Sequence, residues 1–197
     1  MSIEGIKVVL VHQAETELNG WDDLLTELCD GVPPVLVSSS EIHKDLLNEL
    51  SPHRIIVLAP MDSEIYSIFM QSIPVLAAGS SLESFMAAFG GRCVSTSTKN
   101  ENYLMHDGVG LWTGFTDPLK VFGYPCTAPD QSDLPAELVV TAWNDEGVAL
   151  ALRHRQLPTV AWNIHPADLG EELGRELLLA FLEGTYLTGT PTGPPEV

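Results

Sequence analysis

The segment PVLAAGSSLESF, residues 74–85, decides the fold of this chain of 197 residues. Its first five residues form an apolar run of strand length, and apolar residues then recur at helical spacing from Leu82 to Phe89. A strand that is apolar throughout is covered on both faces, as in parallel sheets that carry helices on either side. Gly79 stands where this strand turns into the helix, and a sharp turn suits glycine. We therefore predict a strand and a helix joined by an elbow at Gly79.

Strand and helix patterns alternate along the whole first half of the chain. Apolar and β-branched runs predict strands over residues 6–11, 34–38, 55–59 and 74–78, and helical spacing predicts helices over residues 21–28, 42–50, 63–71 and 82–89. Ser39 or Ser40 is the expected N-cap of the second helix. Because strands that alternate with helices form parallel sheets, we predict an α/β fold with a doubly wound sheet.

The second half of the chain has a different character. From Arg92 to Trp162 the pattern predicts short strands without a helix, over residues 138–142, 148–152 and 159–163. A closing helix is expected over residues 169–182. We interpret residues 1–187 as a single domain, since the length suits one ordinary domain. Residues 188–197 are rich in Pro and Gly, which predicts a disordered tail.

The composition argues against several classes of partner. Lys and Arg number 9 against 27 Asp and Glu, which gives a formal net charge of −18. A surface this negative repels nucleic acid and anionic membranes. The longest apolar runs fall well short of the ~18 residues that a membrane span needs, and the start of the chain lacks the pattern of a secretion signal. The three cysteines form no CxxC pair. We therefore expect a cytoplasmic protein with reduced thiols, no metal site and no cofactor.

Catalytic groups of an open parallel sheet collect at the carboxyl ends of its strands. At that edge the elbow offers Ser80 and Ser81, and His165 follows the last predicted strand. The two serines have two interpretations: one is a nucleophile that acts with His165, and the other is a pair of caps for free N–H groups at the helix start. His154 lies inside a predicted strand and is interpreted as a structural or surface residue.

Four blocks of sequence, the first of them in two stretches, are spread over residues 74–166 and carry a family resemblance. PVLAAGSSLE at 74–83 and AAFGGRCV at 87–94 resemble the PILGICLGHQ and AFGG-x-V elbow region of class I glutamine amidotransferases. LPAELVVTAW at 134–143, ALRHR at 151–155 and WNIHP at 162–166 are similar to later blocks of that family, in the same order. The later blocks look most like the glutaminase subunit of anthranilate synthase and aminodeoxychorismate synthase, enzymes that supply ammonia to chorismate.

The resemblance has consequences for the fold and for the catalytic groups. It implies a flavodoxin-like fold of three layers, with a mostly parallel central sheet, helices on both faces and a small β-rich second half. The family hydrolyses glutamine with a Cys nucleophile at the elbow, which is activated by a His that a carboxylate orients. By this resemblance the Cys position holds Gly79, the His position holds His165 and the carboxylate position holds Ala167. The resemblance thus implies that one member of the triad is retained.

Other positions of the family's site are altered as well. The turn that supplies an oxyanion-hole amide in the family reads differently here, around Met61, and Ser80 follows the elbow. Glu83 stands where the family has a Gln that helps to hold the substrate. The family's substrate loop is replaced by Tyr124, Pro125 and Cys126. Changes at so many positions favour natural decay of a glutaminase site.

Three functions follow from these observations. The favoured one is a non-catalytic amidotransferase-like subunit whose partner is a chorismate-utilising synthase, or which associates with a second copy of itself. The alternative is an active enzyme of the same fold that uses Ser80 or Ser81 with His165. The third is a small-molecule sensor that uses the old pocket. In that pocket Glu83 would favour a cation or an amine over a carboxylate.

Overall fold

The computed structural model describes residues 3–13, 18, 20–70, 73–96, 101–122, 127–165 and 169–184. The strands are β1 (Val8–His12), β2 (Val35–Ser38), β3 (Arg54–Val57), β4 (Val75–Ala78), β5 (Cys93–Ser95), β6 (Glu101–His106), β7 (Leu119–Phe122), β8 (Thr127–Pro129), β9 (Leu138–Asn144), β10 (Ala149–His154) and β11 (Thr159–Trp162). The helices are α1 (Trp21–Leu28), α2 (Lys44–Leu50), α3 (Ser63–Phe69), α4 (Leu82–Ala88) and α5 (Glu171–Glu183). Three short 3₁₀ segments are η2 (Gly79–Ser81), η3 (Gly110–Trp112) and η4 (Gln131–Asp133).

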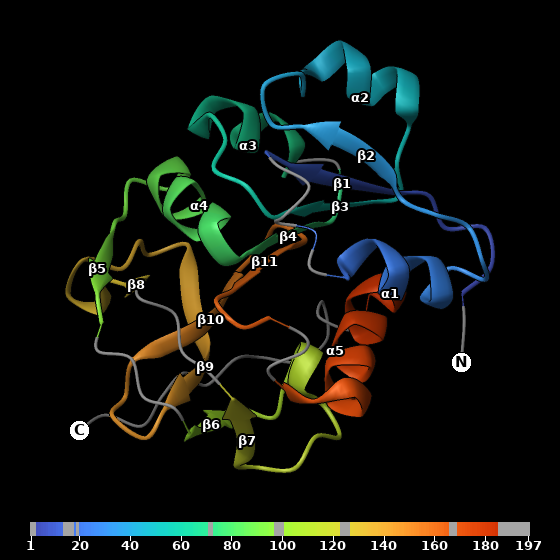
Figure 1. The fold of residues 1–197 in the computed structure, drawn as a ribbon. Helices are drawn as coiled ribbons and strands as arrows, with labels where there is room; N and C mark the ends of the chain where they lie inside the picture. The colour runs from blue at the N-terminus through green and yellow to red at the C-terminus, as the bar shows by residue number, and fades with distance from the viewer. Residues whose placement is uncertain are drawn as a thin grey trace.

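One large sheet organises the described part of the chain (Figure 1). It has nine strands in the order β2-β1-β3-β4-β11-β10-β9-β6-β7. The pairs from β2 across to β11 are parallel, and those from β11 across to β7 are antiparallel. The predicted α/β fold with helices on both faces of a mostly parallel central sheet is confirmed, and the antiparallel strands are its β-rich second half.

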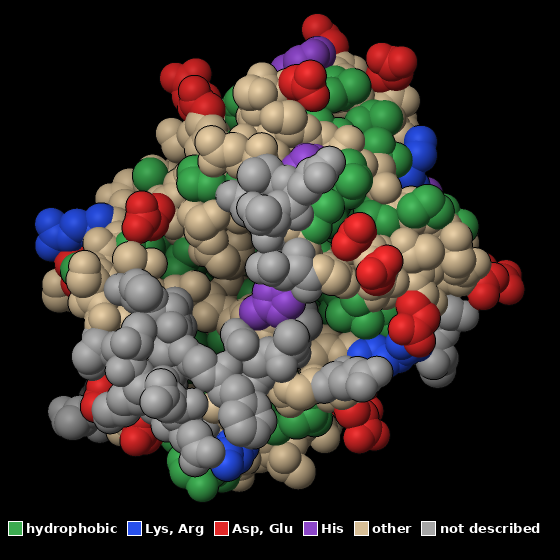
Figure 2. All heavy atoms as spheres, in the orientation of Figure 1, with side chains coloured by type: hydrophobic (Ala, Val, Ile, Leu, Met, Phe, Trp, Pro, Cys, Tyr) green, Lys and Arg blue, Asp and Glu red, His purple; other side chains and the backbone are tan. Residues whose placement is uncertain are grey.

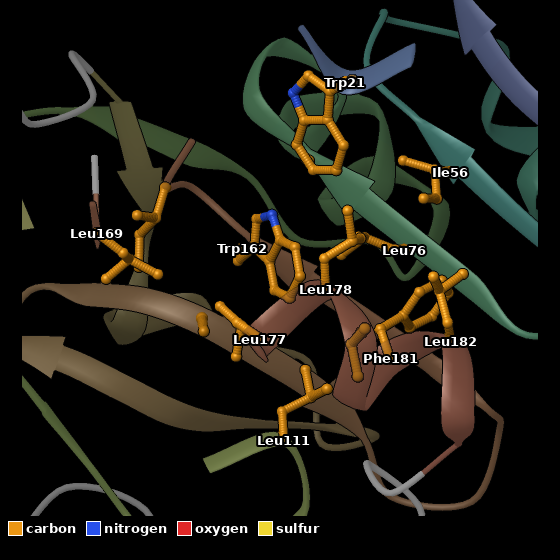
Figure 3. Packing of buried hydrophobic residues seen from close by; sticks show 14 of the residues in the cluster. Trp21, Ile56, Leu76, Leu111, Trp162, Leu169, Leu177, Leu178, Phe181 and Leu182 are labelled. Atoms are coloured by element: carbon orange, nitrogen blue, oxygen red, sulfur yellow. The ribbon is translucent and has the colours of Figure 1, made fainter. Parts of the chain in front are cut away.

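The alternation of side chains along each parallel strand divides the core into two layers. On β1, Val8 and Leu10 belong to one cluster of buried residues, whereas Val9 and Val11 belong to the other. The first cluster packs under α1 and α5, and the second packs under α2, α3 and α4. Figure 3 shows the first cluster, in which Trp21 of α1 lies over Trp162 of β11. Because both faces are covered, these strands read as continuous apolar runs in the sequence.

Four strands were missed by the sequence analysis. They are β5, β6, β7 and β8, of which β5 and β8 form a separate antiparallel sheet of two strands. β6 and β7 pair with each other, and β6 also pairs with β9 at the far edge of the large sheet. They are short and their partners are distant in the chain, so their apolar pattern is weak. The predicted tail at 188–197 lies outside the described residues, and the single-domain interpretation stays a prediction.

The predicted cap of α2 is wrong. His43 is the N-cap, and its Nδ1 accepts a hydrogen bond from the Leu46 amide at 3.2 Å. Ser40 instead forms a hydrogen bond with Ser38, with 2.9 Å between the two hydroxyl oxygens. The helix begins later than its apolar pattern indicated, because the chain first makes a turn after β2. None of the helices that the structure describes is long and apolar enough to cross a bilayer.

Candidate functional site

The elbow lies at the carboxyl end of β4, as predicted. β4 ends at Ala78, and Gly79 opens η2 with a φ of +59°, which leads directly into α4. This left-handed conformation costs glycine nothing but strains residues with a Cβ. A Cβ built at Gly79 would meet no atom within 4 Å. The elbow therefore has room for a side chain, and the backbone conformation alone favours glycine.

The hydroxyls of Ser80 and Ser81 donate hydrogen bonds to backbone carbonyls. Ser80 Oγ lies 2.7 Å from the Leu58 carbonyl oxygen, and Ser81 Oγ lies 2.7 Å from that of Val57. Ser81 is fully buried. The interpretation of these serines as caps is wrong, because neither η2 nor α4 has a side-chain cap. Instead the two hydroxyls fasten the elbow to the end of β3.

The Met61 turn is joined to α4 by Ser84. The Met61 amide donates to Ser84 Oγ at 3.2 Å, and Ser84 Oγ donates in turn to the Ser81 carbonyl oxygen at 2.9 Å. The Met61 side chain is buried in the core beneath α3 and α4. The amide at the expected oxyanion position therefore already has an acceptor within the protein.

The Cys93 thiol, at the start of β5, is affected by burial and by the charge of Glu83 on α4. Burial, and to a lesser extent the negative charge of Glu83, raise the pKa of the Cys93 thiol to about 11. Burial also raises the pKa of the Cys29 thiol. Since the thiolate is the nucleophilic form, both cysteines are protonated and unreactive at neutral pH. Cys126 lies outside the described residues.

His165 lies at the same edge of the sheet as the elbow. β11 pairs with β4 in parallel, with Trp162 opposite Ala78, so the chain leaves both strands at the same edge. The His165 ring stands edge-on to Trp21, with 5.6 Å between ring centroids, and Trp21 stacks on Trp162 at 6.4 Å. This aromatic contact was not predicted from the sequence. The expected sites Ala167, Tyr124 and Pro125 lie outside the described residues.

A second histidine lies at the same edge, and sequence reasoning missed it too. His12 ends β1, and its Nδ1 atom is buried without a hydrogen-bond partner in the described part of the chain. The sequence contained a signal for His12, because a polar residue that ends an apolar strand is expected at the carboxyl edge of a parallel sheet, where catalytic groups collect. Within the ranges that the structure describes, no group of His, Cys, Asp and Glu could hold a metal ion.

Comparisons with known proteins show what this arrangement is similar to. No family model matches the chain. The aminodeoxychorismate synthase of Streptomyces griseus is 36% identical over 120 residues, which cover 59% of this chain and 16% of that protein. Component 2 of the aminodeoxychorismate synthase of Escherichia coli is 26% identical over 147 residues, which cover 69% of this chain and 79% of that protein. A crystal structure of a glutamine amidotransferase from Thermotoga maritima aligns with a TM-score of 0.71 at 14% identity, over 92% of this chain and 98% of that one.

This chain resembles class I glutamine amidotransferases in sequence and in fold. The sequence relatives and the shared fold confirm the resemblance that the four blocks indicated. The chain spans about a sixth of the length of the Streptomyces protein and most of the length of the component 2 protein.

The sequence blocks that carry this resemblance pack on one another. A Cβ built at Gly91, in the AFGG block, would lie 2.8 Å from Cδ of Pro135, so only glycine allows this approach. Phe89 of the same block contacts His154, with 5.1 Å between ring centroids. His154 is buried, and its Nδ1 accepts from the amides of residues 156 and 157 at 3.0 and 2.8 Å. Of the two interpretations of His154, the structural one is confirmed and the surface one is wrong, because the residue is 7% exposed. Close packing accounts for the blocks that contain it.

Proposed function

We propose that this amidotransferase-like protein has lost glutaminase chemistry and acts as a non-catalytic subunit of a chorismate-utilising synthase. The observation that carries the proposal is the elbow. Gly79 occupies the position of the family's nucleophile and has no atom that can attack an amide. Without its nucleophile the triad cannot hydrolyse glutamine, because its members act as a unit.

The groups around the elbow support the same proposal. A replacement nucleophile would need a free hydroxyl beside a base, yet Ser80 and Ser81 both donate to carbonyl oxygens of the β3 end. An oxyanion hole needs a backbone amide aimed at the substrate, yet the Met61 amide donates to Ser84. Restoring catalysis would therefore require several bonds of the elbow to be rearranged.

The proposed partner comes from the relatives. The protein from Escherichia coli is component 2 of a synthase that makes aminodeoxychorismate, and the Streptomyces protein is an aminodeoxychorismate synthase. A chain that keeps this fold without the nucleophile can still present a surface that binds a partner, although it cannot hydrolyse glutamine. We expect that surface to bind the component that converts chorismate with ammonia.

A glutaminase assay of the purified protein tests the loss of chemistry. We expect no release of glutamate above background, with or without the chorismate-utilising component encoded in the same genome. An electrophilic glutamine analogue should leave the protein unmodified at stoichiometric dose, because the pKa of the Cys93 thiol is raised. Glutamate release that disappears in His165→Ala would overturn the proposal.

A second assay separates the proposal from the serine alternative. An electrophilic serine probe should leave the protein unlabelled, because both hydroxyls at the elbow are donors to backbone oxygens. Labelling that is lost in the double variant Ser80→Ala, Ser81→Ala would instead support an active enzyme. The proposed complex with the synthase component is tested by mixing the two purified proteins and measuring the molar mass by light scattering. Two separate species would contradict the proposed partnership.

A further inference from the structure

A groove of about 360 Å³ lies between α5 and the chain that follows η3, on the face of the large sheet that α1 and α5 cover. Figure 1 shows η3 beside α5. The described lining of the groove comes from residues 113–115 and from one side of α5. It contains no residue of the elbow, and none of the four sequence blocks contributes to it. The resemblance to amidotransferases therefore does not explain this groove.

One wall of the groove is the loop that η3 holds in place. Leu111 and Trp112 of η3 are buried in the cluster under α5, and Figure 3 shows Leu111 next to Leu177 and Phe181. The Phe115 amide donates to the Trp112 carbonyl oxygen at 3.2 Å, and the two rings stand edge-on with 6.3 Å between centroids. The half-buried Phe115 side chain is therefore fixed as an apolar wall before any partner binds.

The other wall is a second side of α5, distinct from the side that faces the core. Its residues recur at i, i+3, i+4 and i+7, so they lie in a row along the helix: Glu176, Leu179, Ala180 and Glu183. Leu179 and Ala180 are half-buried, whereas the two glutamates are exposed. The row thus presents a short apolar patch with one carboxylate at each end.

Neither carboxylate is neutralised within the described part of the chain. Glu176 and Glu183 have no ion pair there, and the described lining of the groove contains no Lys or Arg. Two guanidinium groups near α5 are already engaged, since Arg175 pairs with Glu27 of α1 and Arg54 Nε donates to a carbonyl oxygen of α5 at 3.4 Å. Glu183 also lies in the last turn of α5, where the helix dipole favours positive charge. The groove therefore favours a partner that brings a cation to each end of an apolar patch.

The spacing of the two acids favours a helix as the occupant. At 1.5 Å per residue, the seven positions from Glu176 to Glu183 span about 10.5 Å along α5. A second helix that lies along the groove repeats this distance between residues seven positions apart. An extended peptide does not, because its side chains on one face recur about every 6.7 Å. A second copy of this chain lacks the charge, since no helix that the structure describes contains more than one Lys or Arg.

We propose that this groove binds an amphipathic helix of a partner protein, in which two Lys or Arg residues stand seven positions apart with two apolar residues between them. The basic side chains lie beside Glu176 and Glu183, and the apolar ones cover Phe115, Leu179 and Ala180. The proposal does not rest on the loss of glutaminase chemistry, because no residue of the groove belongs to the elbow.

Three synthetic peptides test the charge and the apolar patch separately. Each is an alanine-rich helix of about 20 residues, because shorter helices are marginal in water. The first carries two Lys seven positions apart with two Leu between them, the second replaces both Lys with Glu, and the third replaces both Leu with Gln. In an NMR titration of the whole chain we expect saturable shifts of the Gly114 and Phe115 amides with the first peptide, and about tenfold weaker binding of the other two. No saturable shift with the first peptide, or equal binding of either control peptide, would overturn the proposal.

Variants of the chain then locate the bound peptide. Glu183→Gln should weaken binding of the first peptide about twofold to fivefold, the range of an exposed ion pair. Glu49→Gln on α2 makes the same change in net charge and is the matched control, which should leave the affinity unchanged. Ala180→Lys should place a long side chain in the groove and abolish the shifts. Binding that survives in Ala180→Lys, with the melting temperature unchanged, would place the peptide elsewhere and contradict the proposal.

Light scattering of the chain alone tests whether a second copy fills the groove instead. We expect the same molar mass for the parent and for Ala180→Lys, because two chains of net charge −18 repel each other at this acidic surface. A parent dimer that dissociates in Ala180→Lys would make the second copy the occupant and overturn the proposal.

Discussion

Gly79 has the backbone conformation of the elbow and no side chain. Its φ of +59° costs a residue with a Cβ about 1–2 kcal/mol, yet a Cβ there meets nothing within 4 Å. Gly79→Ala should therefore fold and lose about 1 kcal/mol of unfolding free energy. Gly147→Ala is the matched control, since its φ is +80° with equally open space, and it should lose a similar amount. Urea unfolding measures both losses. A much larger loss for Gly79→Ala than for Gly147→Ala would contradict the open space around a Cβ at Gly79.

The same position defines a prediction about activity. Gly79→Cys would place a thiol on the elbow, but the Met61 amide still donates to Ser84, so the tetrahedral intermediate would lack that donor. Loss of one oxyanion donor typically costs ~10²–10³ in turnover. We expect Gly79→Cys with Ala167→Glu to stay near background in a glutaminase assay. Ready glutamate release from the single variant Gly79→Cys would show that the rest of the site is still organised for catalysis.

Asp130 gives a prediction about pH. Its pKa in the folded chain lies below the ordinary 3.8, first because of Ser132 and then because of Arg92. A carboxyl of this kind stabilises the fold above its unfolded pKa, and the contribution is lost as the pH falls through the folded pKa. Asp130→Asn should therefore be less stable than the parent at pH 6, and the difference should shrink steadily below about pH 3.8. Asp133→Asn is the control, because Asp133 is 60% exposed and lies 4.0 Å from Arg92; an equal effect there would contradict the assignment to Asp130.

At the scale of elements, much of the fold was accessible from the sequence. The apolar runs of β1, β3 and β4 and the helical spacing of α1 and α4 predicted these elements, since burial on both faces leaves a strong local signal. The serines of the elbow were misread because their acceptors lie at the end of β3, about twenty residues earlier in the chain. The contact of Trp21 with His165 was missed for a related reason, because the order of strands in the sheet sets it. Tertiary partners decide these positions, and local pattern does not reveal them.

Helix α5 carries an electrostatic conflict at its end. Its last turn contains Glu183 and no basic residue, although the C-terminus of a helix favours positive charge. Glu183→Gln should stabilise the protein by about 0.3–1 kcal/mol at low ionic strength. Asp22→Asn, in the first turn of α1, should instead destabilise the protein, since a carboxylate is favourable at the N-terminus of a helix. Thermal unfolding in dilute buffer measures both changes, and equal signs for the two variants would refute the dipole explanation.

At the scale of the molecule, negative charge is the dominant electrostatic feature. Figure 2 shows the molecule in the orientation of Figure 1. Asp and Glu side chains lie around the rim of the visible face and over α1, whereas Lys and Arg side chains are scattered singly. The formal net charge of −18 makes the compact state repel itself, and unfolding relieves that repulsion. Added salt shortens the screening length from about 30 Å at 0.01 M to about 3 Å at 1 M. The free energy of unfolding should therefore rise as NaCl is added over this range, most steeply at the low end.

A charge variant distinguishes this repulsion from a general effect of salt on apolar burial. The triple variant Glu172→Gln, Glu176→Gln, Glu183→Gln removes three carboxylates from α5 and changes no residue of the buried clusters. It should be more stable than the parent in dilute buffer and should gain less from NaCl, because less repulsion remains to be screened. Urea unfolding at matched NaCl concentrations gives both slopes. If the parent and the triple variant gain equally from salt, the stabilisation comes from apolar burial, and the acidic surface has no part in setting the stability of this fold.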